Sequence, residues 1–577
     1  MLNTSNDQRK LLPNFEQLFA TTAQAPGGVA RLRELILTLA VQGKLVPQDP
    51  SDEPASELLK KIRAEKDRLI AEGKIKKDKP LPAITEDEKP FELPVGWVFS
   101  CLGEIGVINP KVTAQDDAIC SFVQMSSISV DFLEKHFSED RPWKDIKKGF
   151  TQFSNGDVGL AKITPCFENG KSTVFEDLKN NAGAGTTELH IVRPLAGINP
   201  RYILLFLKTP VFLKNGESVM TGSAGQKRVP RSYFESAPLP LPPLAEQSRI
   251  VARVEELMRL CDALEEKGRL EHTQHQQLLQ AMLDSLTQTT DARDLARHWQ
   301  RLAQHFDLLI DRPEAVDALE QTIVQLAVRG LLVPQDPKDE PGIQLLEKIK
   351  DEKSKYQLKP KSKKSDRLDV KDFLYDLPDG WVWTALQEIT LIGPENGLSP
   401  KPSNIETKYR CLTLTATTSG DFKGEFYKYV EISDKEAEAN FLKENDLLIQ
   451  RGNSIDYVGI AAIYDGKDDD FIYPDLMMRL RLSSLVNLKY VHLTLISKDG
   501  RSYFRSVATG TQGNMPKVNQ TAVNSTPIPL PPLAEQSRIV TRVTELRALC
   551  QQLRDKLAQA RTTQTQLAQA WVEQVAG

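Results

Sequence analysis

Apolar positions near the middle and the end of the chain follow one heptad-like pattern. They recur at alternating spacings of four and three residues, with charged residues between them, in the sets Ile250, Val254, Leu257, Cys261, Leu264 and Ile539, Val543, Leu546, Cys550, Leu553. This spacing predicts two long amphipathic helices, each with a narrow apolar stripe that needs a partner helix. Forty residues in each would form rods of about 60 Å. Because the stripes match, we expect the two helices to pack antiparallel about an approximate two-fold axis.

Both predicted helices follow the same twelve residues, PLPPLAEQSRIV, at 240–251 and 529–540. Two other segments are duplicated in the same order: LAVQGKLVPQDPSDEP (39–54) with LAVRGLLVPQDPKDEP (326–341), and LPVGWV (93–98) with LPDGWV (377–382). This order predicts a tandem duplication in which near-identical frame segments surround dissimilar inserts.

The inserts share a weaker pattern. GDVGLAKITP (156–165) aligns with NDLLIQRGNS (445–454), and SVMTG (218–222) aligns with SVATG (506–510) at nearly the same separation. Short apolar runs broken by Gly, Asn and Asp predict strands and turns with few long helices. We therefore expect two domains of one fold that present different side chains. Trp97 and Trp381 are expected to be buried anchors of these domains.

Composition narrows the functional classes. The chain has 577 residues, 40% of them hydrophobic and 26% charged, which predicts several globular domains. It contains no apolar run long enough for a membrane span and no signal-peptide pattern, and its six scattered cysteines form no C-x-x-C pair. We therefore expect a cytoplasmic protein with reduced thiols and no membrane association. The net charge of −4 means that any nucleic-acid surface is a local concentration of positive charge.

Motifs of enzymes do not fit. The segment GKS (170–172) resembles a phosphate-binding loop, but Pro165 occupies the position where that loop needs glycine. The chain also lacks the H-E-x-x-H and G-x-S-x-G motifs and the Asn-Pro-Pro-aromatic motif of amino-methyltransferases. We expect no catalytic residue, no metal site and no cofactor-binding site in this chain.

The GW openings, the segment GDVGLAKITPCFENGK (156–171) and the two inserts that end in PLPPLAEQSRIV before a heptad helix resemble the specificity subunit of type I restriction–modification enzymes. The resemblance covers nearly the whole chain. It implies an α+β fold: two mixed α/β target-recognition domains of similar fold, separated by long conserved helices that form an antiparallel coiled coil, with a pseudo-two-fold internal repeat. It also implies that each domain reads one half of a bipartite, asymmetric site in double-stranded DNA, while the helices set the spacer.

The resemblance implies partners that perform the chemistry. These are two methyltransferase (modification) subunits that use S-adenosylmethionine, and two motor-nuclease (restriction) subunits that use ATP and Mg²⁺, in a bacterial or archaeal cytosol. Two other hypotheses remain at this stage: a coiled-coil scaffold whose inserts bind proteins rather than DNA, and an enzyme with an unrecognised site in each insert. Divergent inserts in a duplicated frame favour DNA reading, because no matched set of catalytic side chains occurs in both halves.

The repeats and the resemblance together predict six segments. They are an N-terminal helical segment (1–90), a first target-recognition domain (91–243), a central helix (244–308), a second helical segment with a basic linker (309–374), a second target-recognition domain (375–532) and a C-terminal helix (533–577).

Candidate DNA contacts lie in the glycine-containing loops before each PLPPL. Glycine allows close approach of the backbone to phosphates, and Gln, Asn, Lys and Arg read base edges. The first loop (221–234) supplies Gln226, Lys227, Arg228 and Arg231, and the second (509–520) supplies Gln512, Asn514, Lys517 and Asn519. The alternative is a solvated turn with incidental charge.

The aligned segments of the inserts supply four more candidates: Lys162, Lys171, Arg451 and Asn453. Lys162 and Arg451 occupy matching places after an Asp and an apolar run, where either side chain would reach a phosphate or a guanine. The alternative is a cation at a strand end that pairs with a carboxylate.

Overall fold

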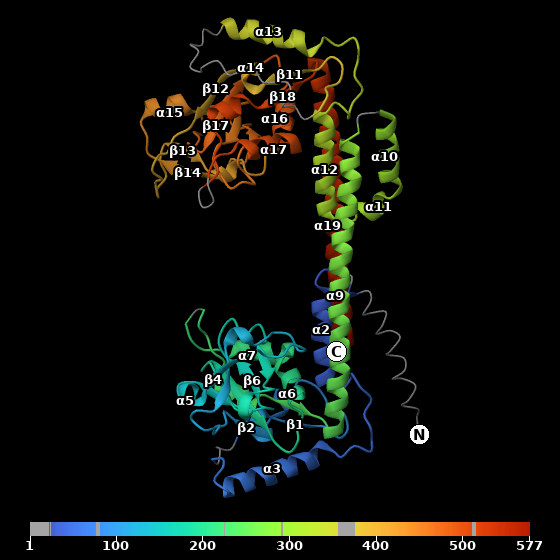
Figure 1. Ribbon diagram of the computed structural model, residues 1–577, viewed down its shortest axis with the longest axis vertical. Helices are drawn as coiled ribbons and strands as arrows, with labels where there is room; N and C mark the ends of the chain where they lie inside the picture. Colours follow the sequence, from blue (N-terminus) through green and yellow to red (C-terminus); the bar gives the residue numbers. More distant parts are fainter. Residues whose placement is uncertain are drawn as a thin grey trace. The chain divides into compact units, whose positions relative to one another are not determined.

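The computed structural model describes residues 22–23, 25–76, 81–223, 225–289, 292–355, 375–510 and 515–576. The chain divides into two compact units: unit 1 comprises Met1–His272 with Ala560–Gly577, and unit 2 comprises Thr273–Gln559. The two 44-residue helices, α9 (Leu244–Thr287) and α19 (Leu533–Ala576), are shared between the units (Figure 1). Unit 1 contains the start of α9 and the end of α19, and unit 2 contains the remainder of both.

The insert domain of unit 1 contains three sheets. One is an antiparallel four-stranded sheet of order β2-β9-β6-β7, formed by Gly106–Ile108, Leu189–Pro194, Val158–Ala161 and Ser172–Val174. Another, of order β4-β3-β8-β5, contains one parallel pair, β3 with β8, and is formed by Glu139–Pro142, Ile119–Val123, Gly183–Gly185 and Thr151–Phe153. The first and last strands of the domain pair with each other: β1 (Val98–Ser100) and β10 (Leu239–Leu241). The helices are α4 (Leu102–Ile105), α5 (Trp143–Ile146), α6 (Pro200–Leu207), α7 (Pro210–Ser218) and α8 (Arg231–Ser236).

The insert domain of unit 2 repeats the first of these sheets. The order β12-β17-β15-β16 is again antiparallel and is formed by Thr390–Asn396, Met477–Leu482, Leu447–Gln450 and Ala461–Ile463. The closing pair is β11 (Val382–Ala385) with β18 (Pro527–Leu530), and a hairpin joins β13 (Tyr409–Leu412) to β14 (Tyr427–Val430). The helices are α14 (Leu386–Ile389), α15 (Asp434–Asn440), α16 (Leu488–Ile496), α17 (Lys498–Val507) and α18 (Gln520–Asn524).

The predicted common fold of the inserts is therefore confirmed, and the difference between them is localised. The shared sheet keeps its strand order. Among the residues that the structure describes, unit 1 adds a four-stranded mixed sheet, and unit 2 adds the two-stranded β13–β14 hairpin instead. Equivalent ion pairs stabilise the start of strands β6 and β15. Arg193 Nε donates a hydrogen bond to buried Asp157 at 2.7 Å, and Arg481 Nη2 donates one to buried Asp446 at 3.1 Å. Each carboxylate also accepts a backbone N–H three residues before it, so the aligned Asp fixes the turn into the strand.

Helix α2 (Gly28–Val41) connects the two long helices within unit 1. Its Arg33 pairs with Asp262 of α9 at 2.6 Å, while Asp52, which follows α2 in the chain, pairs with Arg249 near the start of α9. Successive contacts thus fall at decreasing positions of α9, which shows that α2 and α9 run antiparallel.

The same helix runs parallel to the end of α19. Arg31 Nη1 donates to Thr565 O at 3.2 Å. Leu39, later in α2, belongs to an apolar cluster with Val575, which is also later in α19. Because α2 is antiparallel to α9 and parallel to α19, the two long helices run in opposite directions within unit 1. This confirms the antiparallel arrangement that the matched stripes predict.

The equivalent helix of unit 2 is α12 (Pro313–Val328). Its ion pairs to α19, Asp317 with Arg554 at 2.7 Å and Glu320 with Arg547 at 3.0 Å, run in opposite senses along the two helices. Helix α12 is therefore antiparallel to the start of α19, just as α2 is antiparallel to the start of α9.

The predicted stripe residues are buried or half-buried, and they do not pack on the other long helix alone. Those of α9 belong to a core that includes α2, and those of α19 to a core that includes α12. Within the described residues, the other frame helices are α3 (Ala55–Ala71), α10 (Ala292–Gln304), α11 (Phe306–Leu309) and α13 (Gly342–Lys355). Across the described residues, no helix combines the length and the apolar character that a membrane crossing requires.

Candidate nucleic-acid interface

The duplicated frame segments meet in a buried joint where each insert domain joins its long helix. Glu246, at the start of α9, accepts the indole N–H of Trp97 at 2.9 Å and an amide N–H of Gln48 at 3.3 Å. The second copy repeats both contacts, each at 3.0 Å, with Glu535, Trp381 and Gln335. Burial raises the pKa of both carboxyl groups, and these donors partly oppose that rise. The joint thus links the GW, VPQDP and LAEQ segments, which explains why they are duplicated together, and it confirms that both Trp side chains are buried anchors.

The glutamine that follows this glutamate in each copy, Gln247 or Gln536, also attaches the insert domain to the start of its long helix. Gln247 accepts the backbone N–H of Asn199 at 3.0 Å and donates to Pro242 O at 3.1 Å. Gln536 makes the same two bonds at 2.8 and 2.9 Å, to Asn487 and Pro531. Each buried side-chain amide therefore bonds two backbone groups: a carbonyl in the loop after β10 or β18, and the N–H of the residue that caps α6 or α16.

The loop before β10, which we call loop A (residues 221–229), closes on the end of strand β6. Thr221 and Arg228 exchange backbone hydrogen bonds of 3.1 and 2.8 Å, and Val229 N donates to Lys162 O at 2.8 Å. Buried His190 supports this closure from β9, because its Nε2 donates to Val229 O at 3.2 Å. Burial lowers the pKa of His190 to about 4, so the ring is neutral at physiological pH.

The corresponding loop B (residues 509–518) repeats this geometry on strand β15. Thr509 and Lys517 exchange backbone bonds of 2.9 and 3.0 Å, and Val518 N donates to Arg451 O at 2.8 Å. The alignment of Lys162 with Arg451 is thus confirmed in space. The same correspondence places Lys517 where loop A has Arg228. Gln512 and Asn514 lie outside the described residues.

Comparisons with known proteins agree with this geometry. The family model described as "Type I restriction modification DNA specificity domain" matches residues 94–273 and 378–560, so it covers both insert domains and the helix that follows each. The chain belongs to the type I restriction–modification specificity family. It is 44% identical to the EcoEI and EcoAI specificity subunits of Escherichia coli, in each case over 94% of this chain and 93% of the relative. A solved chain from work on complex assembly and conformational transition of a type I restriction–modification system matches with a TM-score of 0.50 and 17% identity, covering 84% of this chain and 99% of that one.

Several predicted contact residues of this specificity subunit are exposed at the loops. Gln226 and Lys227 of loop A and Lys517 of loop B are exposed, and none of their side chains has a partner within residues 81–223, 225–289, 375–510 or 515–576. Lys162 is half-buried beside loop A. Arg451 is half-buried beside loop B, and its Nε has no partner among the described residues. These residues form the candidate interface.

Other predicted contact residues are engaged inside their own domain. Arg231 pairs with Glu235 on α8, and Lys171 Nζ donates to Met125 O at 3.0 Å. Asn519 accepts Ala522 N at 2.8 Å as the N-cap of α18, and Asn453 donates to Gln450 Oε1 at 2.6 Å. These four side chains hold local structure, so any contact with DNA would compete with a bond that the fold already uses.

Sequence reasoning missed Glu188, which lies in the turn between β8 and β9. Its carboxylate binds the Arg228 guanidinium, and this hydrogen-bonded ion pair, assisted by the charge of Lys162, lowers the pKa of Glu188. No signal in the sequence identifies this residue, because Glu188 and Arg228 lie 40 residues apart. Only the register between β6 and β9 brings the turn beside loop A.

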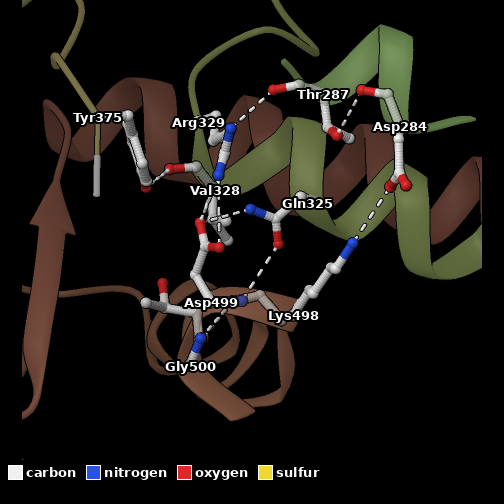
Figure 2. Close-up of polar contacts among 11 residues, drawn as sticks. Asp284, Thr287, Gln325, Val328, Arg329, Tyr375, Lys498, Asp499 and Gly500 are labelled. Atoms are coloured by element: carbon white, nitrogen blue, oxygen red, sulfur yellow. Dashed lines mark hydrogen bonds and ion pairs between the residues drawn. The ribbon is translucent and has the colours of Figure 1, made fainter. Parts of the chain in front are cut away.

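A polar network attaches the second target-recognition domain to the helices of unit 2 (Figure 2). Arg329 Nη2 donates a hydrogen bond at 3.1 Å to the carboxylate of Asp499, in the first turn of α17. Arg329 Nη1 donates to Thr287 O of α9 at 2.7 Å. Gln325 of α12 donates to the same carboxylate, and Lys498 pairs with Asp284 at 3.1 Å. The duplication aligns Arg329 with Gln42 and Asp499 with Val211, so the first half has neither partner of the central ion pair.

Proposed function

We propose that this chain is the DNA sequence-recognition subunit of a type I restriction–modification complex, with each target-recognition domain reading one half of a bipartite, asymmetric site. One observation carries the proposal. Two domains with the same central sheet present loops A and B from equivalent positions through identical joints, but the loops have different side chains. Identical joints give both domains the same attachment to their helices, while unlike loops read unlike half-sites.

The long helices supply the spacing between the half-sites. Each has 44 residues, which corresponds to about 66 Å of helix. Half-sites on one face of B-DNA are separated by about 34–36 Å per helical turn, so helices of this length span the separation with surface left for partners. Ion pairs and a shared apolar core between α19 and α12 keep this part of the spacer rigid.

Exposed leucines at equivalent places of the repeat support docking of two methyltransferase subunits. Leu260 and Leu549 are 46% and 58% exposed, and Leu278 and Leu567 are 56% and 52% exposed. Unit 1 holds Leu260 with Leu567, and unit 2 holds Leu549 with Leu278, so the duplication gives each unit the same pair of apolar residues on its helices. Two like surfaces suit two copies of one partner.

The partner subunits perform the chemistry in this proposal. The methyltransferase subunits use S-adenosylmethionine, the two motor-nuclease subunits use ATP and Mg²⁺, and this chain is the non-catalytic reader in the cytoplasm. Its membership of the specificity family and the match of both halves to the specificity model support that division of labour.

Mapping of methylated adenines tests the proposal. The chain is expressed with its methyltransferase subunits in cells that lack other adenine methylation, and the modified positions are sequenced. We expect one bipartite motif with two unlike half-sites and a fixed spacer, and we expect Lys227→Ala and Lys517→Ala to weaken methylation. A symmetrical uninterrupted motif, or methylation without any motif, would contradict the proposal. A Leu260→Lys/Leu549→Lys variant should lose co-purification with the methyltransferase while its melting temperature stays unchanged.

A further inference from the structure

Arg228 of loop A is held from two sides. Its Nε and Nη2 each donate to the Glu188 carboxylate at 2.9 Å, and its Nη1 donates to Gln226 O at 3.1 Å. The side chains of Arg228 and Glu188 are 43% and 24% exposed, so the pair lies at the surface while the guanidinium is fixed in orientation. A two-point bond of this kind restricts the rotation that a single bond would leave free.

The donors that remain on Arg228 suit one kind of acceptor. A guanidinium has five N–H groups, and three of those on Arg228 are used within the domain. One N–H remains on each terminal nitrogen, which is the number and spacing that the O6 and N7 acceptors of guanine require in the major groove. Arginine that is already oriented loses less conformational freedom when it binds.

Among residues 375–510 and 515–576, the second domain does not repeat this ion pair, although the equivalent backbone hydrogen bonds are present. Lys162 N donates to Glu188 O at 2.9 Å in the first domain, and Arg451 N donates to Leu476 O at 2.7 Å in the second. Leu476 thus occupies the place of Glu188, and Lys517 occupies the place of Arg228. The Lys517 ammonium has no partner among residues 375–510 and 515–576.

We propose that Glu188 is a positioning residue that determines specificity: it orients Arg228 to read a guanine in the half-site of the first target-recognition domain. This inference rests on the proposed function of the chain. The carboxylate has a second effect, because its negative charge beside the DNA opposes sequence-independent attraction to phosphates. Glu188 therefore favours discrimination between bases at some expense of affinity for random DNA.

The test compares Glu188→Leu, which copies the residue of the second domain, and the isosteric Glu188→Gln in the complex with methyltransferase subunits. Binding and methyl transfer are measured on duplexes that carry each base at each position of both half-sites. We expect discrimination at one guanine of one half-site to fall roughly tenfold in Glu188→Leu, and less in Glu188→Gln. Affinity for random DNA at low salt should rise roughly two- to fivefold. The other half-site and the spacer should be unchanged.

Two further variants separate the possible failures. Glu235→Gln removes the carboxylate partner of Arg231 in the same domain and should leave base preference unchanged. If Arg228→Ala leaves every base preference intact, loop A does not read DNA and its assignment in the proposed function fails. If Arg228→Ala relaxes one half-site and both Glu188 variants keep full discrimination, the proposed role of Glu188 is wrong while the function of the chain stands. A loss of methylation in both Glu188 variants with base preference retained would show a merely structural role.

Discussion

Replacing Arg329 with Gln should weaken the attachment of the second target-recognition domain to its helices. The variant carries the residue that the first half has at this position, Gln42, so the repeat itself shows that the frame accepts it. The change removes the ion pair with Asp499, the bond to Thr287 O and the stacking of the guanidinium over Tyr375, whose ring centroid is 4.6 Å from Arg329 Cζ.

The expected loss follows from the exposure of these groups. The Arg329 and Asp499 side chains are 20% and 21% exposed, so their interaction falls between a surface pair and a fully buried one. Asp499 keeps Gln325 as a donor and its place in the first turn of α17, which limits the penalty for an unpaired charge. We expect the free energy of unfolding of unit 2 to fall by about 2 kcal/mol. For a unit of the length of Thr273–Gln559, that lowers its melting temperature by about 3 °C.

Calorimetry of the full chain gives the melting shift, and hydrogen exchange of the α17 amides locates it. The matched control is Gln42→Arg, which should change stability by less than about 0.5 kcal/mol, because Val211 offers no carboxylate. A double-mutant cycle with Asp499→Asn should give a coupling energy of about 1–2 kcal/mol. A coupling energy near zero, or equal effects of Arg329→Gln and Gln42→Arg, would refute the reasoning.

Two other predictions concern the helices and the joints. Inserting four residues after Lys267 in α9 lengthens that helix by about 6 Å, so methylation mapping should show a spacer longer by about two base pairs with both half-sites unchanged, and altered half-sites would contradict the division between readers and spacer. Burial raises the pKa of Glu246 and Glu535 above their ordinary value of 4.5, so the joints contribute most to stability below about pH 4.5 and less as pH rises through the raised pKa. As pH rises from 4 to 8, the double variant Glu246→Gln/Glu535→Gln should therefore become more stable relative to the unaltered chain, as measured by unfolding in denaturant. If the difference between their free energies of unfolding stays constant over this pH range, the account is wrong.

The joints were predictable in part, because the residues that form them lie in duplicated segments and both Trp side chains were expected to be buried anchors. Trp97, Gln48 and Glu246 come from the three duplicated segments, and each bonds another of the three. The stripes of α9 and α19 were equally clear from their spacing. Helices α2 and α12 were not identified as additional partners. The residues Thr322–Val328 of α12 are all buried, so the pattern of this helix points to no single neighbour.

The candidate interface was predictable in position but only partly in detail. The glycine-containing loops and the alignment of Lys162 with Arg451 located both loops. The sequence could not show that Asn519 caps α18, because the same residue type serves equally as a base reader and as a helix cap. Glu188 was missed because its contact depends on strand register and not on local pattern.

The differences between the two target-recognition domains indicate how the side chains that read DNA can change while the fold of the domain is kept. Glu188 and Leu476 each contribute the same backbone carbonyl to the end of a central strand, so the backbone does not depend on the side chain at this position. The ion pair of Asp157 with Arg193, and its equivalent in the second domain, hold the other end of that strand and are the same in both halves. A substitution at the Glu188 position therefore alters the charge beside the loop while the sheet and the joint remain intact. This separation between supporting bonds and variable side chains is what a frame with two unlike readers requires.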